Sequence, residues 1–335
     1  MRDNALFSVI AALAVLTRLD SALLLFPAAL FRGASIVRRQ RPPLPARTTA
    51  LRIAAFVVPG ATLLGVWLAW KLATYGAVLP NTFTAKRPDE LFVERGFYYL
   101  GVFFISYLLA PFLMVGPIAF VRAIRERNFA VVSIVVAITL WGAYVVWVGG
   151  DFMEFRFVVP ALPLGIVALV WTIIRLAANR FIRSAAFALV PIGSLHHALT
   201  FGADANPADR VDRVIESVGI LNSHIDQNDG NWPGIGRLLG RTFAGQRDVS
   251  IATTAAGAIP FYAKMRAIDM HGLTDRTVAL HGIPTRGNVG HRRVAPLSYL
   301  IGRKVNLVFG HPWLVPNRAT RPSEAQVWVP AFGKR

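Results

Sequence analysis

Asp151, Glu154 and Arg156 stand close together in the stretch "WVGGDFMEFRFVVPALP", between two long apolar runs. A carboxylate can accept a proton from a hydroxyl group, whereas an arginine keeps its charge and can hold a phosphate with two parallel hydrogen bonds. The two glycines before Asp151 permit a ligand to approach the backbone closely. We expect Asp151 to lie at the water interface, where its charge costs little desolvation. The pattern indicates a pocket for an anionic, phosphate-bearing group.

Other polar residues occur in positions where they can join such a pocket. The stretch "YGAVLPNTFTAKRPDE" carries Asn81 and Lys86, and "GHRR" carries His291 after a Gly- and Pro-rich loop. Arg18 and Asp20 interrupt an apolar stretch, and ionisable residues in such stretches usually face a cavity or each other. The candidate binding residues are therefore Arg156, Asn81, Lys86, Arg18, Asp20 and His291, with Asp151 as the candidate catalytic residue.

A structural interpretation explains the same residues. Asp151 can cap the next helix, Arg156 can anchor a helix to lipid headgroups, and Arg18 can pair with Asp20. "GHRR" can be an ordinary exposed turn. "IDMHGLTD" mixes carboxylates with His271, but a strand end followed by a turn accounts for it, so we expect no metal and no cofactor. Both interpretations stay open on the residues alone.

The elements that position these residues are membrane helices. The chain has 335 residues, 54% of them hydrophobic and 16% charged, and it has no cysteine. Charge-free runs of the length that a helix needs to cross a bilayer occur at 53–70, 96–121, 128–150, 157–174 and 184–203. Such runs must be helical, because lipid offers the backbone no other hydrogen-bonding partner. Residues 4–31 fit either one long kinked helix or a pair of short ones.

Arginines in alternate connections predict the orientation. The connections near Arg32–Arg52, Arg122–Arg127 and Arg175–Arg183 hold Glu126 as their only acid, whereas Lys71–Arg95 and Asp151–Arg156 balance five basic residues with five acids. The positive-inside rule therefore places the first set in the cytoplasm and the second set outside. The net charge of +18 reflects those arginines and their contact with anionic lipid, so we expect no nucleic-acid partner.

The chain changes character at residue 204. "NPADRVDRVIESVGIL" has helical spacing, and "DVSIATT", "MRAIDMHG" and "KVNLVFG" are typical of short buried strands separated by helices such as "APLSYLIGRK". We therefore expect an α-helical polytopic membrane domain over residues 1–203, followed by a small extracytoplasmic α/β domain with a partly parallel sheet over residues 204–335.

The order of five stretches resembles one known group of enzymes: "LTRLDSALLLFPA", "YGAVLPNTFTAK", "GGDFMEFRFVVPALP", "IATTAAGAIPFYAKMRAIDMHGLTD" and "GHRRVAPLSYL". They resemble the GT-C superfamily membrane glycosyltransferases, specifically the bacterial group that includes the terminal arabinofuranosyltransferases of cell-wall arabinan. The resemblance covers nearly the whole chain, and the "GGDFM" and "TTAAGAIPFY…IDMHGLTD" blocks are its most specific parts.

The resemblance implies a multi-pass protein of the bacterial cytoplasmic membrane. Such enzymes move a sugar, which is arabinofuranose in the group that this chain resembles, from a polyprenyl-phosphate carrier to a glycan or lipid acceptor. A carboxylate takes the acceptor's proton while basic residues hold the phosphate. In this sequence Asp151, Arg156, Asn81 and Lys86 fall in matching motifs, and His291 falls in the matching outer-loop motif.

The sequence departs from that group at its start. The resemblance implies a catalytic acid in a first outer loop, ahead of several more helices, but this chain reaches "LTRLD" within its first twenty residues. We therefore expect it to be the C-terminal portion of a longer enzyme, whose activity alone is uncertain. The main alternative is a non-catalytic membrane protein whose outer module binds a glycan or a partner. A transporter is less favoured, because no inverted repeat is visible.

Overall fold

The structure is a computed structural model that describes residues 1–37, 45–86, 93–202, 215–223, 225–226, 231–246, 248–285 and 290–310. Contacts divide the chain into two compact units. The first unit contains Met1–Val78, Val93–Gly150 and Phe155–Thr200, and the second contains Leu79–Phe92, Asp151–Glu154 and Phe201–Arg335. Residues 79–92 and 151–154 therefore join a unit made mostly of the C-terminal part. The boundary of the two sequence domains at residue 203 stays a prediction.

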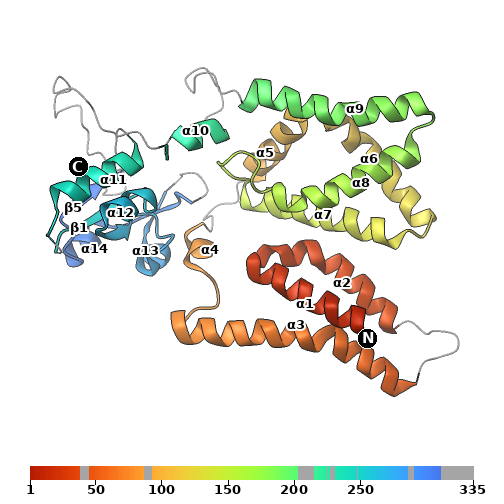
Figure 1. Ribbon diagram of the computed structural model, residues 1–335, viewed down its shortest axis with the longest axis horizontal. Coiled ribbons are helices and arrows are strands. Elements are labelled where there is room, and N and C mark those ends of the chain that lie inside the picture. Colours follow the sequence, from red (N-terminus) through yellow and green to blue (C-terminus); the bar gives the residue numbers. More distant parts are fainter. Residues whose placement is uncertain are drawn as a thin grey trace. The chain divides into compact units, whose positions relative to one another are not determined.

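Long helices make up the first unit (Figure 1). They are α1 (Arg2–Thr17), α2 (Ala22–Val37), α3 (Ala46–Tyr75), α5 (Val93–Ser106), α6 (Ala110–Arg125), α7 (Phe129–Val148), α8 (Leu162–Leu176) and α9 (Arg180–His197), with the short turns η1 (Leu19–Ser21) and η2 (Val159–Ala161). Within the described residues, four helical segments are long and apolar enough to cross a membrane: Leu19–Val37, Ala46–Tyr75, Phe129–Val148 and Val159–Leu176. Their lengths and compositions are those of a membrane protein.

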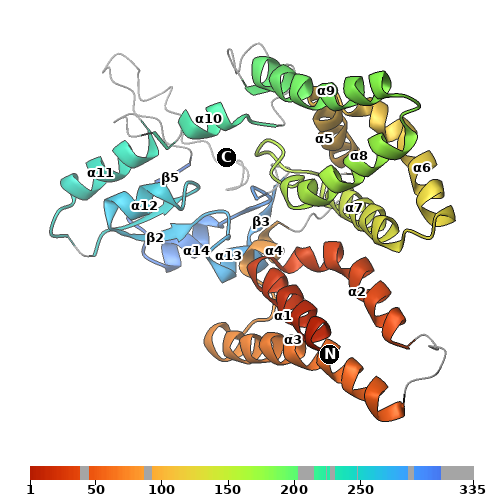
Figure 2. The same ribbon diagram turned by 45° about the vertical axis from the view of Figure 1, so that its right-hand side comes forward.

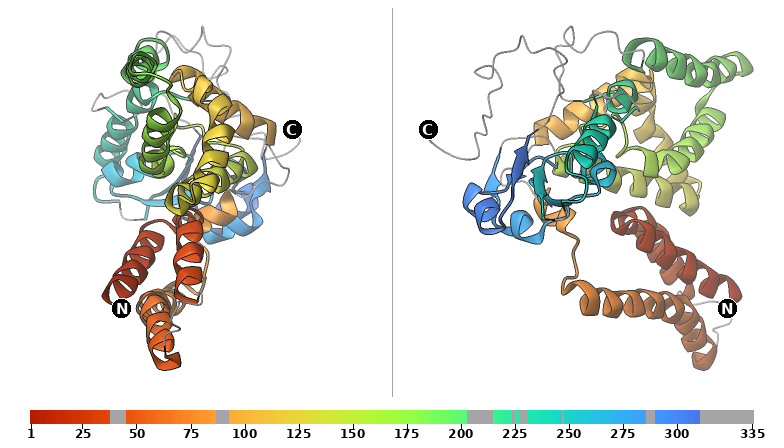
Figure 3. Two further views of the ribbon diagram at one scale, coloured as in Figure 1. Left: turned by 90° about the vertical axis from the view of Figure 1, so that its right-hand side faces the viewer. Right: turned by 60° about the vertical axis from the view of Figure 1, so that its left-hand side comes forward.

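Residues 4–31 form a pair of helices rather than one kinked helix. The chain leaves α1 at Arg18, which is extended (φ −157°, ψ 110°), and enters α2 through η1. Asn4 Nδ2 donates to the Arg52 carbonyl at 3.2 Å, and the Gly60 amide donates to Ser8 Oγ at 2.9 Å. In Figure 3 the red helices α1 and α2 and the orange α3 lie together as one group.

The predicted helix over 96–121 is not continuous, because it breaks in its middle. α5 and α6 are bent by 102° at a gap of a few residues, where Leu108 takes a left-handed conformation (φ 54°) and Pro111 opens α6. α9 supports the break: His196 Nδ1 lies 2.8 Å from the Ser106 carbonyl oxygen, and the His197 ring stacks on Tyr107 at 4.3 Å. The two histidines of α9 therefore support the break between α5 and α6.

A parallel sheet is the centre of the second unit (Figure 2). Its strands are β1 (Ser250–Thr253), β2 (Arg266–Asp269) and β5 (Leu307–Phe309) in the order β2-β1-β5, with Ile251 opposite both Ala267 and Leu307. The three strands lie where the sequence predicted them. A small antiparallel pair, β3 (Ile283–Pro284) and β4 (Arg293–Val294), stands beside them.

Helices cover both faces of this sheet. Ile251 packs with Ile235 and Ile259 from α11 (Trp232–Thr242) and α12 (Ala258–Ala263). The next residue, Ala252, packs on the other face with Val278 and Leu300 from α13 (Arg276–His281) and α14 (Leu297–Gly302). Alternation of side chains along a strand produces this division. The unit also contains α4 (Asn81–Ala85) and α10 (Val218–Ser223). Of the helix predicted over 206–221, residues 206–214 lie outside the described residues, 215–217 are not helical because Glu216 bridges Met153, and α10 forms the end.

Candidate functional site

Two glycines end α7 and turn the chain toward Asp151. Gly149 (φ 82°) and Gly150 (φ 69°) are both left-handed, a conformation that glycine adopts without the steric cost of a Cβ. A Cβ on Gly150 would lie 2.7 Å from Tyr99 Cβ, well inside van der Waals contact. The sequence suggested that the glycine makes room for a ligand. The structure shows that Gly150 makes room for the buried side chain of Tyr99, which is 1% exposed.

Asp151 is buried, with 1% of its surface exposed, so the expectation of a carboxylate at the water interface is wrong. Its Oδ1 accepts a hydrogen bond from the Phe152 amide at 2.9 Å. It does not cap the next helix either, because that helical turn begins only at Val159. A buried carboxylate is costly unless the protein compensates its charge, which makes Asp151 a position where removal of the charge has consequences.

Residues after Asp151 pair with a short segment from the C-terminal part of the chain. Met153 and Glu216 form a parallel bridge, and the Glu154 amide donates to the Glu216 carbonyl at 2.9 Å. Glu154 Oε2 accepts a 2.6 Å hydrogen bond from the amide of Val218, the first residue of α10. A carboxylate at a helix start satisfies a backbone donor that lacks a helical partner. Glu154 therefore has a structural role that the sequence did not reveal.

Aromatic side chains in the first unit hold the second half of the same connection. The Phe157 amide donates to the Tyr99 hydroxyl at 3.2 Å, and Trp141 Nε1 donates to the Phe157 carbonyl at 2.6 Å. The buried Phe155 ring lies 5.3 Å from the Phe103 ring. Arg156 itself is exposed, and its guanidinium lies 5.6 Å from the centre of the Phe157 ring.

The "GHRR" turn gathers the candidate residues of the second unit. Arg292 is 2% exposed, and its Nη1 donates to the Lys86 carbonyl at 3.1 Å. A Cβ on Gly290 (φ 96°) would lie 3.7 Å from Lys86 Cε. The His291 ring meets Phe152 edge-on at 5.3 Å. Three stretches separated by tens of residues thus meet at 290–292: α4 with Lys86, the stretch after Asp151, and the turn itself.

His271 lies beside this turn. In the sequence this residue stood out only as part of a possible metal site in "IDMHGLTD" and was not among the candidate site residues. Its ring lies 4.5 Å from the His291 ring, and its Nδ1 is 2.9 Å from the Arg293 carbonyl oxygen. Burial lowers the pKa of His271 below its ordinary value, although the bond to Arg293 and the charge of Asp269 oppose the shift. The imidazole is therefore neutral at neutral pH.

The carboxylates near His271 hold the turn after β2 and the start of α13. Asp269 accepts from the His271 amide at 2.9 Å and from the Thr274 amide at 2.8 Å. Asp275 caps α13 by accepting from the Val278 amide at 3.0 Å, and it also accepts from the Tyr299 hydroxyl at 2.9 Å. In the part of the chain that the structure describes, no three His, Asp or Glu side chains are arranged to hold a metal ion.

The remaining candidates are dispersed. Arg18 and Asp20 form a two-pronged ion pair, with Nε to Oδ1 at 2.7 Å and Nη2 to Oδ2 at 2.8 Å, as the structural interpretation expects. Asn81 begins α4 and is half-buried. Arg156 belongs to the first unit, whereas Lys86 and Asp151 belong to the second, so their common cleft stays a prediction.

Comparison with known proteins identifies one part of the chain. A family model described as a domain of unknown function (DUF8728) matches residues 214–330, which include the parallel sheet and the "GHRR" turn. No curated protein and no solved structure matches the chain.

Proposed function

We propose that the protein is a membrane glycosyltransferase that moves a sugar from a polyprenyl-phosphate donor to a cell-envelope glycan or another acceptor. One observation supports this function. The Lys86 stretch, the stretch that begins with Asp151 and the His291 turn belong to one compact unit and contact one another at residues 290–292. Such a transfer needs a general base and cations in one site, and these contacts bring the stretches that carry Lys86, Asp151 and His291 together.

The proposed step uses Asp151 as the base. Its carboxylate takes the proton of an acceptor hydroxyl while that oxygen attacks the anomeric carbon of the donor sugar. The bond between the anomeric carbon and the phosphate oxygen breaks, and the lipid phosphate leaves with the electron pair. Lys86 and Arg156 offset the negative charge that grows on the phosphate, with Asn81 and His291 as further contacts. The sugar follows only from the resemblance to arabinofuranosyltransferases.

The test is sugar transfer by membranes that contain the full-length protein. Asp151→Asn and Arg156→Ala should each lower transfer from radiolabelled polyprenyl-phosphate sugar by at least about a hundredfold at equal protein abundance. Asp248→Asn and Arg241→Ala are matched controls on exposed side chains of the second unit and should keep the wild-type rate. Wild-type transfer by both Asp151→Asn and Arg156→Ala contradicts the proposed chemistry.

The burial of Asp151 favours one alternative, a non-catalytic membrane protein whose second unit binds a glycan or a partner. In that protein Asp151 only stabilises the connection between α7 and η2. Asp151→Asn then lowers the unfolding free energy but leaves any transfer activity of the membranes unchanged.

We also propose that residues 204–335 lie outside the cytoplasm of a bacterial cell. The arginine-rich connections support this orientation. A phosphatase fused at Phe332 should be active, and a reporter that works only in the cytoplasm should be inactive there. The reverse pattern refutes the orientation.

A further inference from the structure

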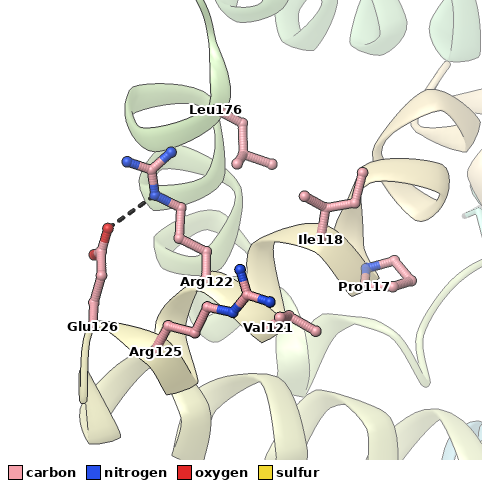
Figure 4. Close-up of a pocket in the computed structure, with 7 residues that line it drawn as sticks. All are labelled: Pro117, Ile118, Val121, Arg122, Arg125, Glu126 and Leu176. Carbon is pink, nitrogen blue, oxygen red and sulfur yellow. Dashed lines mark hydrogen bonds and ion pairs between the residues drawn. The ribbon is translucent and has the colours of Figure 1, made fainter.

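A hollow of about 650 Å³ lies at the ends of α6 and α8 in the first unit, and no residue of the proposed reaction lines it. It is lined by Pro117, Ile118, Val121, Arg122, Arg125, Glu126 and Leu176. Figure 4 shows Leu176 facing Ile118 across the opening, with the guanidinium groups of Arg122 and Arg125 beside it. The hollow is thus apolar on two sides and charged at one end.

Glu126 organises the charged end. Its Oε1 accepts from Arg122 Nε at 2.9 Å, and its Oε2 lies 2.9 Å from Arg175 Nη2, while Arg122 Nη1 donates to the Arg175 carbonyl at 2.8 Å. The hydrogen bond from Arg122 is the main reason that the pKa of Glu126 lies below its ordinary value, so this carboxylate is charged at neutral pH. These contacts tie the end of α6 to the end of α8.

The charges of this end do not cancel. Three arginines, Arg122, Arg125 and Arg175, surround the single carboxylate of Glu126. The side chain of Arg125 makes no hydrogen bond or ion pair to any residue that the structure describes. An unneutralised guanidinium with its planar set of donors is suited to a phosphate group.

The apolar sides match a hydrocarbon chain. Ile118 is 60% exposed and Val121 46%, and Met114, one helical turn before Ile118, is 81% exposed. α6 follows α5 in the bent helix pair, and α8 is part of a segment long enough to span a membrane, so an exposed apolar strip here is suited to contact with lipid. A ligand that fills the hollow must carry a phosphate at one end and an apolar chain at the other.

We propose that this hollow binds an anionic phospholipid of the membrane leaflet on the arginine-rich side, with the phosphate on Arg122 and Arg125 and an acyl chain along Ile118 and Val121. Basic pockets at the ends of membrane helices bind anionic headgroups in this way. The apolar sides favour a phospholipid over free phosphate, and the site is independent of sugar transfer.

The test measures lipid binding to the purified full chain in a neutral detergent by native mass spectrometry. Phosphatidylglycerol should bind wild-type protein more tightly than phosphatidylcholine, and Arg125→Gln should weaken phosphatidylglycerol about fivefold, the scale of one surface arginine. Ile118→Ser should weaken both lipids, because it removes apolar contact without a change of charge. Arg180→Gln is the matched control on α9, outside the hollow, and should leave the affinity within about twofold.

Three results refute the proposal. The first is equal affinity of the wild-type protein for the two lipids, a comparison that needs no variant. The second is an equal loss in Arg180→Gln and Arg125→Gln, which indicates general attraction to anionic lipid. The third is displacement of phosphatidylglycerol by millimolar inorganic phosphate, which indicates a site for the free anion.

Discussion

Gly150 offers a sharp test of how the stretch before Asp151 is built. Gly150→Ala adds a methyl group at a left-handed residue (φ 69°) whose Cβ would stand 2.7 Å from Cβ and 2.8 Å from Cγ of Tyr99. No rotation of the tyrosine relieves this contact, because its Cβ is fixed to the backbone of α5. Tyr99 is 1% exposed, and its hydroxyl accepts from the Phe157 amide, so a shift of α5 also disturbs that bond.

Two costs combine in this variant. An alanine in a left-handed conformation costs about 1–2 kcal/mol, part of which is offset because alanine reduces the entropy of the unfolded chain. Overpacking against a buried side chain adds about 1–3 kcal/mol. Gly150→Ala should therefore lower the unfolding free energy by about 2–4 kcal/mol.

Gly76→Ala is the matched control. Gly76 ends α3 with φ 61°, but no atom lies within 4 Å of the position that its Cβ would take. This variant has the backbone cost without the clash and should lose only about 1 kcal/mol. Unfolding free energies of both can be measured by circular dichroism during titration of mixed micelles with sodium dodecyl sulfate. An equal loss in the two variants refutes the packing of Gly150 on Tyr99.

Three further predictions concern helix packing, pH and charge. Gly96→Ala should destabilise the first unit by about 1–3 kcal/mol, because the added Cβ would stand 2.4 Å from the Val146 carbonyl oxygen. In the control Gly101→Ala, on the same helix, the added Cβ meets no atom within 4 Å. This control should be neutral or stabilising in the same titration. Burial lowers the pKa of His271 below 6.5 in the folded protein, so protonation of this imidazole destabilises the fold. This cost is absent at higher pH and grows as the pH falls below 6.5. His271→Asn should therefore flatten the decline of unfolding free energy between about pH 7 and 5. Arg18→Gln and Asp20→Asn should each lower the unfolding free energy by more than half of the loss in the double variant, because each single variant leaves the partner's charge unpaired. If the losses of the two single variants add up to that of the double variant, the ion pair contributes no coupling energy.

The sequence predicted the elements whose signal is local. β1, β2 and β5 are short apolar runs bounded by polar residues, as expected for strands buried on both faces, and the helices at 46–75, 129–148 and 159–176 follow long apolar runs. The break between α5 and α6 was missed because the run was assessed by its length and its lack of charge. Pro111 was the available signal, since proline is typical of the first turn of a helix.

The candidate site was predicted only in part, because its contacts join residues far apart in the chain. Composition placed Lys86, Asp151 and His291 in separate polar stretches, and their stretches do belong to one unit. The burial of Asp151 and the pairing of Glu154 with Val218 depend on tertiary contacts that leave no periodic pattern. His271 was visible only as a histidine near two carboxylates.

The make-up of the second unit limits how often the chain can cross a bilayer. In the proposed orientation the second unit lies on one side of the membrane, and it takes its chain from before α5, from between α7 and η2, and from after α9. The number of crossings between any two of these segments must therefore be even. In that orientation, between the first two segments, the bent pair of α5 and α6 counts as a single crossing beside that of α7.

The same parity applies to the segments before α8 and after α9. If α8 crosses the bilayer, α9 must return, although its two arginines keep it outside the four most apolar segments. A π-helical turn, Ala198–Gly202, continues α9 and lengthens its apolar end. Arg180 and Arg183 then mark one membrane surface and the far end of that turn the other. An odd number of crossings between any two of these segments would place parts of the second unit on opposite sides of the membrane.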